Sequence, residues 1–225
     1  MIKLENTEVV GWEHAIRGMR NPMNSWEKSD SQTCTNCNGC LPGQECERYK
    51  NGTFIGPNDL DLMTRLRNAG TDHRKFMRMI TVYLDITAPL YWWKEFDTYK
   101  VGTVANSCST MHKIHDKEFT LDDFSTEHLY PEVREAFENT IIKYLNEARK
   151  TYNFLSDTPS KKDAWWQMIQ LLPSSYNQRR TVMLNYEVLA NIYKSRRNHK
   201  LDCWHTFCDW IEELPYSELI TGEKK

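Results

Sequence analysis

The sequence predicts a single-domain α+β protein over residues 1–225, and three observations support this. The run at 80–86, Ile-Thr-Val-Tyr-Leu-Asp-Ile, is rich in β-branched and aromatic residues and is typical of a strand. Apolar residues spaced three and four apart from Pro131 to Tyr152 predict a long helix. The chain has 225 residues, 40% hydrophobic and 27% charged, which suits a globular domain with a sizeable core.

The remaining elements are read from the same periodicities and from capping and turn residues. Either Asn58 or Asp59 is expected to be the N-cap of a helix that Gly70 closes. The basic pairs Lys161-Lys162 and Arg179-Arg180 are expected in solvated loops. A strand is expected at 2–10, and further helices are expected at residues 12–19, 73–79, 181–197 and 201–214.

Charge and hydropathy limit the classes of partner. The formal net charge is -2, which gives no general attraction to nucleic acid polymers or to anionic membranes. No run of eighteen apolar residues is present, and the first residues lack the pattern of a signal peptide. We therefore expect a cytoplasmic protein without a membrane partner. Eight Trp and eleven Tyr suit a core, a subunit interface or a stacking platform, and composition alone does not choose among these.

Residues 30–57 are polar and cysteine-rich, and we expect them to form an insertion or loop. Thiolates two residues apart on tight turns can converge on one metal ion. A four-thiolate zinc site and an iron–sulfur cluster are both compatible with the spacing, and so is a reduced segment without metal. Cys108, Cys203 and Cys208 are expected to be small buried residues. The candidate metal ligands are Cys34, Cys37, Cys40 and Cys46.

Two other segments point to a function. The first begins with Ala88-Pro89, continues with Thr-Tyr-Lys at 98–100, and reaches Ser-Thr-Met-His at 109–112. The second follows Leu172-Pro173 and reads Asn-Tyr-Glu-Val-Leu-Ala-Asn-Ile-Tyr-Lys-Ser-Arg over 185–196. In order and spacing they resemble the flavin-dependent thymidylate synthases, and the resemblance covers roughly residues 58–212.

The resemblance implies an antiparallel sheet with helices packed against it. It also implies a homotetramer whose nucleotide and FAD sites lie at subunit interfaces. The family reaction is reductive methylation of dUMP to dTMP, with methylenetetrahydrofolate as carbon donor and NADPH as reductant. Carried over by motif position, the implied flavin-binding residues are Tyr99, Lys100, Asn185 and Asn191, and the implied nucleotide-binding residues are Ser109, Arg196 and His205.

Helical geometry agrees with part of this implication. Asn185 and Arg196 are eleven residues apart, so on one helix they would lie about 20° from each other. They would then form a polar stripe that lines a ligand. The alternative from periodicity alone is the solvated face of an amphipathic helix.

The chain departs from the family where the resemblance places the cationic clamp. Thr98, Tyr99 and Lys100 stand in place of Arg-His-Arg, so two planar guanidinium groups are missing. Tyr99 keeps a ring that can stack on the flavin, and Lys100 keeps one charge for a phosphate. Met111 replaces the arginine of a Ser-x-Arg-Tyr element, and Glu187 reverses the charge of a motif arginine. Two functions therefore remain open: a methylating flavoenzyme with a remodelled pocket, and a degenerate nucleotide- or metal-binding protein whose cysteine-rich insertion recruits a partner.

Overall fold

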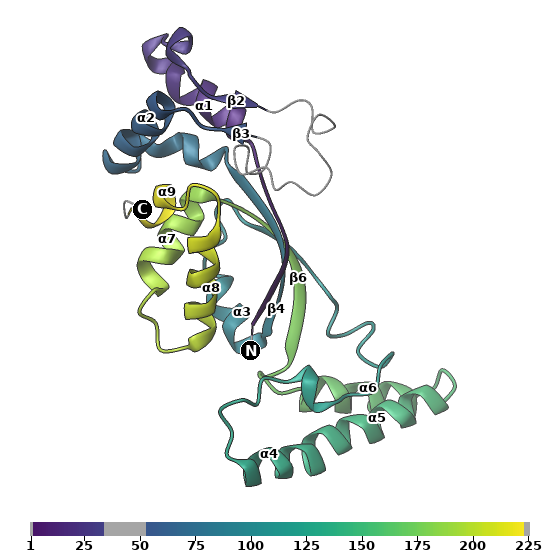
Figure 1. Ribbon diagram of the computed structural model, residues 1–225. Helices are drawn as coiled ribbons and strands as arrows, with labels where there is room; N and C mark the ends of the chain where they lie inside the picture. Colours follow the sequence, from purple (N-terminus) through teal and green to yellow (C-terminus); the bar gives the residue numbers. More distant parts are fainter. Residues whose placement is uncertain (1, 34–52, 223–225) are drawn as a thin grey trace, which may run out of the picture. The chain divides into compact units, whose positions relative to one another are not determined.

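The computed structural model describes residues 2–33 and 53–222. The chain divides into two compact units (Figure 1). Unit 1 takes the first three positions together with residues 86–98 and 106–181, and unit 2 takes residues 4–85, 99–105 and 182–225. The four strands of the larger sheet each contribute residues to both units: β1 (Lys3–Val10), β4 (Thr81–Pro89), β5 (Val104–Ser107) and β6 (Asn177–Asn185).

An antiparallel sheet with packed helices forms the scaffold, as the resemblance implied. Its four strands run in the order β1-β4-β6-β5. Inward positions of β4 and β6 alternate with more exposed ones, and Val82, Leu84, Val182 and Leu184 are almost fully buried. The strands are β1 (Lys3–Val10), β4 (Thr81–Pro89), β5 (Val104–Ser107) and β6 (Asn177–Asn185).

Helices of unit 1 share a small apolar core. The predicted long helix is present as three consecutive elements, and α6 packs beside α5. Phe119, Phe124, Leu145 and Met168 lie at the centre of this core. The helical elements are α3 (Leu90–Phe96), η6 (Leu121–Asp123), α4 (Pro131–Phe137), the π-helix η7 (Glu138–Ile142), α5 (Lys143–Phe154) and α6 (Pro159–Leu171).

Unit 2 contains the helices of the N-terminal 85 residues and those that follow β6. Helix α7 packs against α8, α9 and η5, and α1 also packs against η5. Trp12 makes edge contacts with Tyr186 and Tyr216, with ring centroids 5.2 and 5.3 Å apart. The helical elements are α1 (Trp12–Arg20), η1 (Asn21–Met23), η2 (Trp26–Lys28), α2 (Pro57–Asn68), η5 (Arg74–Arg78), α7 (Tyr186–Arg196), α8 (Asp202–Glu213) and α9 (Glu218–Thr221).

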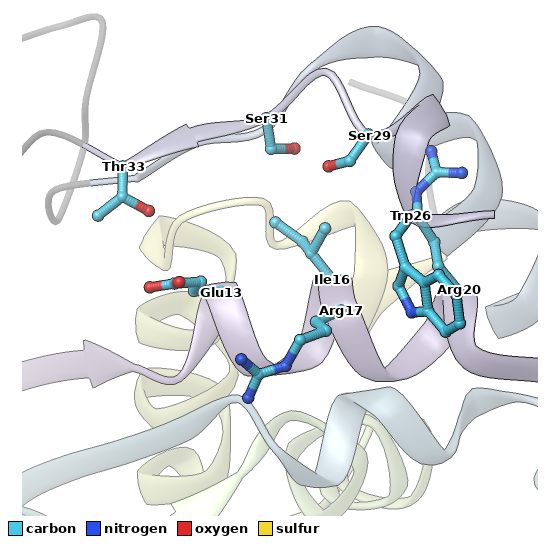
Figure 2. A pocket seen from close by; sticks show the side chains of 8 residues that line it. All are labelled: Glu13, Ile16, Arg17, Arg20, Trp26, Ser29, Ser31 and Thr33. Carbon is cyan, nitrogen blue, oxygen red and sulfur yellow. The ribbon is translucent and has the colours of Figure 1, made fainter. Parts of the chain in front are cut away.

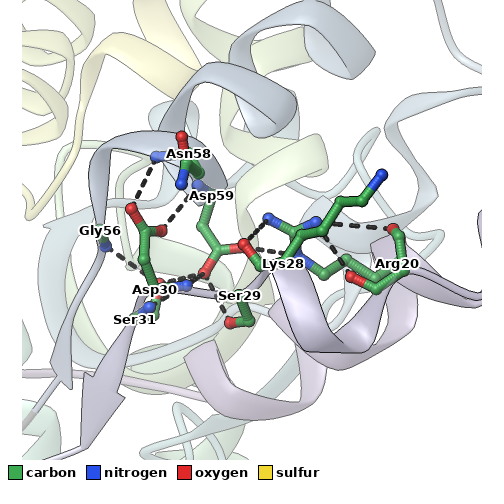
Figure 3. A network of polar contacts seen from close by, with 9 residues as sticks. Arg20, Lys28, Ser29, Asp30, Ser31, Gly56, Asn58 and Asp59 are labelled. Atoms are coloured by element: carbon green, nitrogen blue, oxygen red, sulfur yellow. Dashed lines mark hydrogen bonds and ion pairs between the residues drawn. The ribbon is translucent and has the colours of Figure 1, made fainter.

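A buried ion pair connects Arg20, the last residue of α1, with Asp59 in the first turn of α2 (Figure 3). The Nε of Arg20 donates to Oδ1 of Asp59 at 2.6 Å, and the two side chains are 4% and 0% exposed. The hydroxyls of Ser29 and Ser31 donate to the other carboxylate oxygen at 2.7 and 2.6 Å. Burial raises the pKa of Asp59, but these hydrogen bonds and the Arg20 charge outweigh burial and lower it below its usual value.

The predicted N-cap of α2 is wrong. The helix begins at Pro57 after Gly56, and Asp59 lies inside its first turn. The backbone N–H groups of Asn58 and Asp59 instead donate to the carboxylate of Asp30, at 2.9 and 3.1 Å. Asp30 is remote in sequence, so a local capping rule does not find it.

The cysteine-rich segment begins and ends at a short ladder. Strands β2 (Gln32–Thr33) and β3 (Thr53–Phe54) pair antiparallel, with Thr33 opposite Thr53. Cys34, Cys37, Cys40 and Cys46 lie outside the described residues, so the metal hypothesis stays a prediction. Cys203 and Cys208 are buried as expected, whereas Cys108 is exposed, which corrects the expectation for that residue.

The predicted helix at 181–197 is also wrong in its first part. Residues 181–185 belong to β6, and the helix begins only at Tyr186. Val182 and Leu184 are both buried, in the two-residue alternation of a strand. Lys161-Lys162 lie in the first turn of α6 and Arg179-Arg180 lie in β6, so neither pair is in a loop.

Candidate functional site

Asn185 caps the N-terminus of α7 and also forms a hydrogen bond to a neighbouring loop. Its Oδ1 accepts hydrogen bonds from the backbone N–H groups of Glu187 and Val188, each at 3.1 Å, which is N-cap geometry. Its Nδ2 donates to the carbonyl oxygen of Gly102 at 3.4 Å. Gly102 has φ +80°, and a Cβ there would lie 2.8 Å from Nδ2 of Asn185. Asn185 therefore holds the loop at 99–103 against the helix, and it does not lie on a helical face beside Arg196.

Arg196 ends α7 between two aromatic rings. Its Nε donates to the hydroxyl of Tyr99 at 2.9 Å. Its guanidinium carbon lies 4.8 Å from the Trp204 ring centroid and 5.7 Å from that of Tyr99. The two rings meet edge to face at 6.2 Å. The structure thus brings together Tyr99 and Arg196, which the motifs had placed almost a hundred residues apart, and adds Trp204.

The loop at 99–103 also carries an unsatisfied hydroxyl. Among the described residues, the buried Oγ1 of Thr103 has no hydrogen-bond partner. Lys100, three residues earlier, is exposed. A hydroxyl and an ammonium group in one short loop form a donor set suited to a phosphate or to ligand hydroxyls.

The histidines of this region support the turn between α7 and α8. A ring nitrogen of His205, Nε2, lies 2.6 Å from the carbonyl oxygen of His199. Nδ1 of His199 accepts the backbone N–H of Leu201 at 3.2 Å. His199 also contacts the Trp204 ring at 6.3 Å between centroids. His205 is therefore in the same part of unit 2 as Arg196, although its Nε2 is already occupied.

Glu187 is at the centre of a charged network beside α7. Its side chain is 8% exposed and pairs with Arg74 and Arg78 of η5. Nη2 of Arg74 also donates to Oδ1 of Asn191 at 3.0 Å. Burial raises the pKa of Glu187, but the hydrogen bonds and charges of Arg78 and Arg74 outweigh it and lower the pKa. Glu187, which stands where the family motif has an arginine, is therefore neutralised by two arginines of η5.

In unit 1 the candidate Ser109 forms a local turn. Its hydroxyl oxygen accepts the backbone N–H groups of Met111 and His112, at 3.1 and 2.8 Å. The hydroxyl hydrogen remains able to donate to a phosphate oxygen. The side chain is exposed.

Arg180 is a candidate that the sequence did not indicate. Its guanidinium carbon lies 4.1 Å from the Trp93 ring centroid, and Nη1 donates to Asp97 at 2.8 Å. Its Nε donates to Gln178, whose Nε2 in turn donates to the carbonyl oxygen of Cys108, next to Ser109. Two successive hydrogen bonds, through Gln178, therefore connect the Arg180 guanidinium with the backbone next to Ser109. Residues 179–180 were expected in a loop, so the position of Arg180 on strand β6 was not anticipated.

A small pocket lies between α1 and the segment that follows it (Figure 2). Its volume is about 180 Å³, and its lining includes Arg17, Trp26 and Thr33. Arg20 also borders it, but the Arg20 guanidinium is engaged by Asp59 and by the carbonyl oxygens of Ser25 and Lys28. This pocket therefore offers little room and no freely directed guanidinium from Arg20.

Within residues 2–33 and 53–222, no cluster of three or more His, Cys, Asp or Glu side chains suits a metal ion. In the same part of the chain, no helix is long and apolar enough to cross a membrane. The sequence matches no protein-family profile and no curated protein.

Comparison with solved structures defines the class of fold as that of the flavin-dependent thymidylate synthases. The thymidylate synthase X (ThyX) of Helicobacter pylori, solved with FAD and dUMP, gives a TM-score of 0.67 at 14% identity, covering 99% of this chain and 98% of that one. A second structure of that enzyme, also with FAD and dUMP, gives 0.64 at 15% identity, with coverages of 99% and 100%. The UMP/dUMP methylase PolB of Streptomyces cacaoi, bound to 5-Br dUMP, gives 0.58 at 12% identity, with coverages of 99% and 95%. At identities this low the likeness establishes the fold.

Proposed function

We propose that this protein binds a pyrimidine nucleotide and FAD in unit 2 and methylates the pyrimidine reductively, with dUMP or a related nucleotide as substrate. The observation that carries the proposal is the Arg196 guanidinium held by Tyr99 and Trp204, in a fold whose solved examples contain FAD and dUMP. Arg196 occupies the motif position to which the resemblance assigns the nucleotide.

The residues of unit 2 fit an anionic aromatic cofactor. The Thr103 hydroxyl is buried without a partner among the described residues, and Lys100 adds a positive charge in the same loop. Tyr99 supplies a ring, and Asn191 supplies an amide whose oxygen Arg74 orients. Bound FAD would supply the hydride for the reductive step. The residues of unit 2 named here would bind and orient the ligands.

The other reactants and the assembly follow from the same proposal. NADPH would be the reductant and methylenetetrahydrofolate the carbon donor, as the resemblance implies. The assembly would be a homotetramer. Exposed aromatic residues such as Tyr130 (77% exposed) and Phe154 (88%) would suit subunit contacts.

FAD is expected to bind weakly, because the cationic clamp is incomplete. Thr98 donates its hydroxyl to the carbonyl oxygen of Glu95 at 2.7 Å, and the Tyr99 hydroxyl accepts from Arg196. Neither side chain replaces a guanidinium. Two lost charged hydrogen bonds at about 1.5–3 kcal/mol each correspond to about two to four orders of magnitude in affinity.

The same observation favours a second candidate function, a nucleotide-binding protein that has lost the methylation chemistry. In that case Arg196 would still bind the nucleotide, and added FAD would have no effect. The two functions differ in product formation and agree in nucleotide binding.

Titration calorimetry with dUMP tests the binding step. Arg196→Ala should weaken dUMP binding by about 1.5–3 kcal/mol, the range for a hydrogen bond to a charged group. Arg65→Ala is the matched control, because Arg65 is 67% exposed and pairs only with Asp61 of its own helix in the described structure. Unchanged dUMP affinity in the Arg196 variant would show that α7 does not bind the nucleotide.

A further inference from the structure

A second and larger pocket lies on another side of α7. It has a volume of about 670 Å³ and is formed by residues at the end of α2, the turn before η5, α7 and α9, all within unit 2. Four cationic side chains line it, namely Arg67, Arg74, Lys194 and Arg197. None of the described residues that line it carries a carboxylate.

Carboxylates outside the pocket neutralise two of these four charges. Arg74 pairs with Glu187 at 3.4 Å. Arg197 pairs with Asp209 at 2.5 Å and with Glu212 at 3.2 Å.

The other two charges, those of Arg67 and Lys194, are not compensated in this way. Among the described residues, Arg67 donates only to neutral oxygens: the carbonyls of Leu219 and Ile220 and the amide of Asn68, at 3.0–3.3 Å. Lys194 is exposed and forms no ion pair within the described part of the chain. Within residues 2–33 and 53–222, about two positive charges therefore face the pocket without a counterion.

The surroundings of Arg67 disfavour its positive charge, and a bound anion would offset this effect. Its bonds to the last turn of α9 fix the guanidinium, and a Cβ at Gly222 would lie 2.4 Å from its nitrogens. Burial lowers the pKa of Arg67, and the charge of Arg74 lowers it further. Both effects oppose the charged form of a group that stays protonated, and a negative ligand would offset both.

The pocket is separate from the Tyr99–Arg196–Trp204 cluster. At 100° per residue, Lys194 lies about 160° around the axis of α7 from Arg196, and Arg197 lies about 100° from it. Tyr99, Arg196 and Trp204 do not line the pocket. One helix therefore presents a cation–aromatic cluster on one side and a cationic cavity on another.

We propose that this pocket binds the diphosphate of a nucleotide. Its volume lies in the range of small-ligand sites, and its uncompensated charge matches a multiply charged anion. Thr71 and Asn191 add polar groups, and Ala190 and Ile220 add apolar surface for the rest of the ligand. The pocket shares Asn191 with the residues proposed to bind FAD, and none of its residues is among those proposed to hold the pyrimidine.

The test is calorimetric titration of the full chain with ADP and with inorganic pyrophosphate at low ionic strength. Wild-type protein should bind both, and Lys194→Gln should weaken binding by about tenfold or more, the effect of one charged hydrogen bond. Lys194→Arg should restore most of the affinity. Lys162→Gln, which removes an exposed lysine of α6, is the matched control and should have no effect.

Absence of saturable binding at about 1 mM ligand, or equal affinity of Lys194→Gln and wild type, would overturn the proposal. Unchanged ADP binding in Arg196→Ala would support it and would keep its result separate from that of the pyrimidine site. Competition with FAD tests whether the site is distinct: failure of FAD to displace ADP would support a separate diphosphate site, and displacement would assign the pocket to the FAD site already proposed and overturn the inference.

Discussion

Replacing Glu187 by Gln removes the negative charge at the centre of the α7–η5 network. The Glu187 side chain is 8% exposed, and its partners Arg74 and Arg78 are 15% and 56% exposed. Arg74 would then remain largely buried without its counterion, whereas water would solvate Arg78. Breaking a buried pair on one side costs about 3–5 kcal/mol, and an exposed partner adds little. We expect Glu187→Gln to lower the free energy of unfolding by about 3 kcal/mol, the low end of that range.

The pH dependence gives an independent check on the same residue. The folded-state pKa of Glu187 is lowered, so its contribution is fully present above the unfolded pKa of about 4.3. That contribution is lost as the pH falls through the folded pKa. Between neutral and acidic pH, Glu187→Gln should therefore show a smaller loss of stability than the wild type.

Urea denaturation followed by circular dichroism measures both effects. Asp61→Asn is the matched control, because Asp61 and Arg65 form an exposed pair on α2, 66% and 67% exposed. That control should change stability by no more than about 0.5 kcal/mol. A Glu187→Gln effect no larger than the Asp61→Asn effect would refute the assignment of the network as a buried stabilising one.

Two further predictions concern other parts of the chain. Asp59→Asn should lower the free energy of unfolding by about 3 kcal/mol, since Arg20 is 4% exposed and would lose its counterion; a chemical denaturation midpoint equal to that of wild type would contradict this. Protein purified without oxygen or chelator should contain one zinc site or iron–sulfur cluster per chain, and elemental analysis that finds neither metal would remove this hypothesis for Cys34, Cys37, Cys40 and Cys46.

The sequence predicted most elements of the fold because their periodicities are strong. The strand at 80–86 and the long helix after Pro131 are both present. The error at 181–185 arose because Val182 and Tyr186 are spaced for one helical turn as well as for alternate strand positions. A hydrogen bond that is remote in sequence favours the strand over the helix: the carbonyl oxygen of Ile80 accepts the backbone N–H of Tyr186, more than a hundred residues away.

The sequence predicted individual residues of the candidate site but not the contacts between them. Asn185 and Arg196 were both identified, but the cap that Asn185 forms could not be seen while a helix was expected around it. The aromatic partner Trp204 and the cation Arg180 follow from tertiary packing, because each is positioned by residues from other elements. Local patterns carry no information on such contacts.

Formation of dTMP from dUMP, with NADPH and methylenetetrahydrofolate supplied, tests the proposed function most directly when FAD is varied. The incomplete clamp predicts little product at the flavin content of the purified protein and product that increases as FAD is added in excess. Thr98→Arg combined with Lys100→Arg should raise flavin occupancy and shift this dependence to lower FAD. Binding of dUMP without dTMP formation at any FAD concentration would contradict the proposed methylation and leave the nucleotide-binding function in its place.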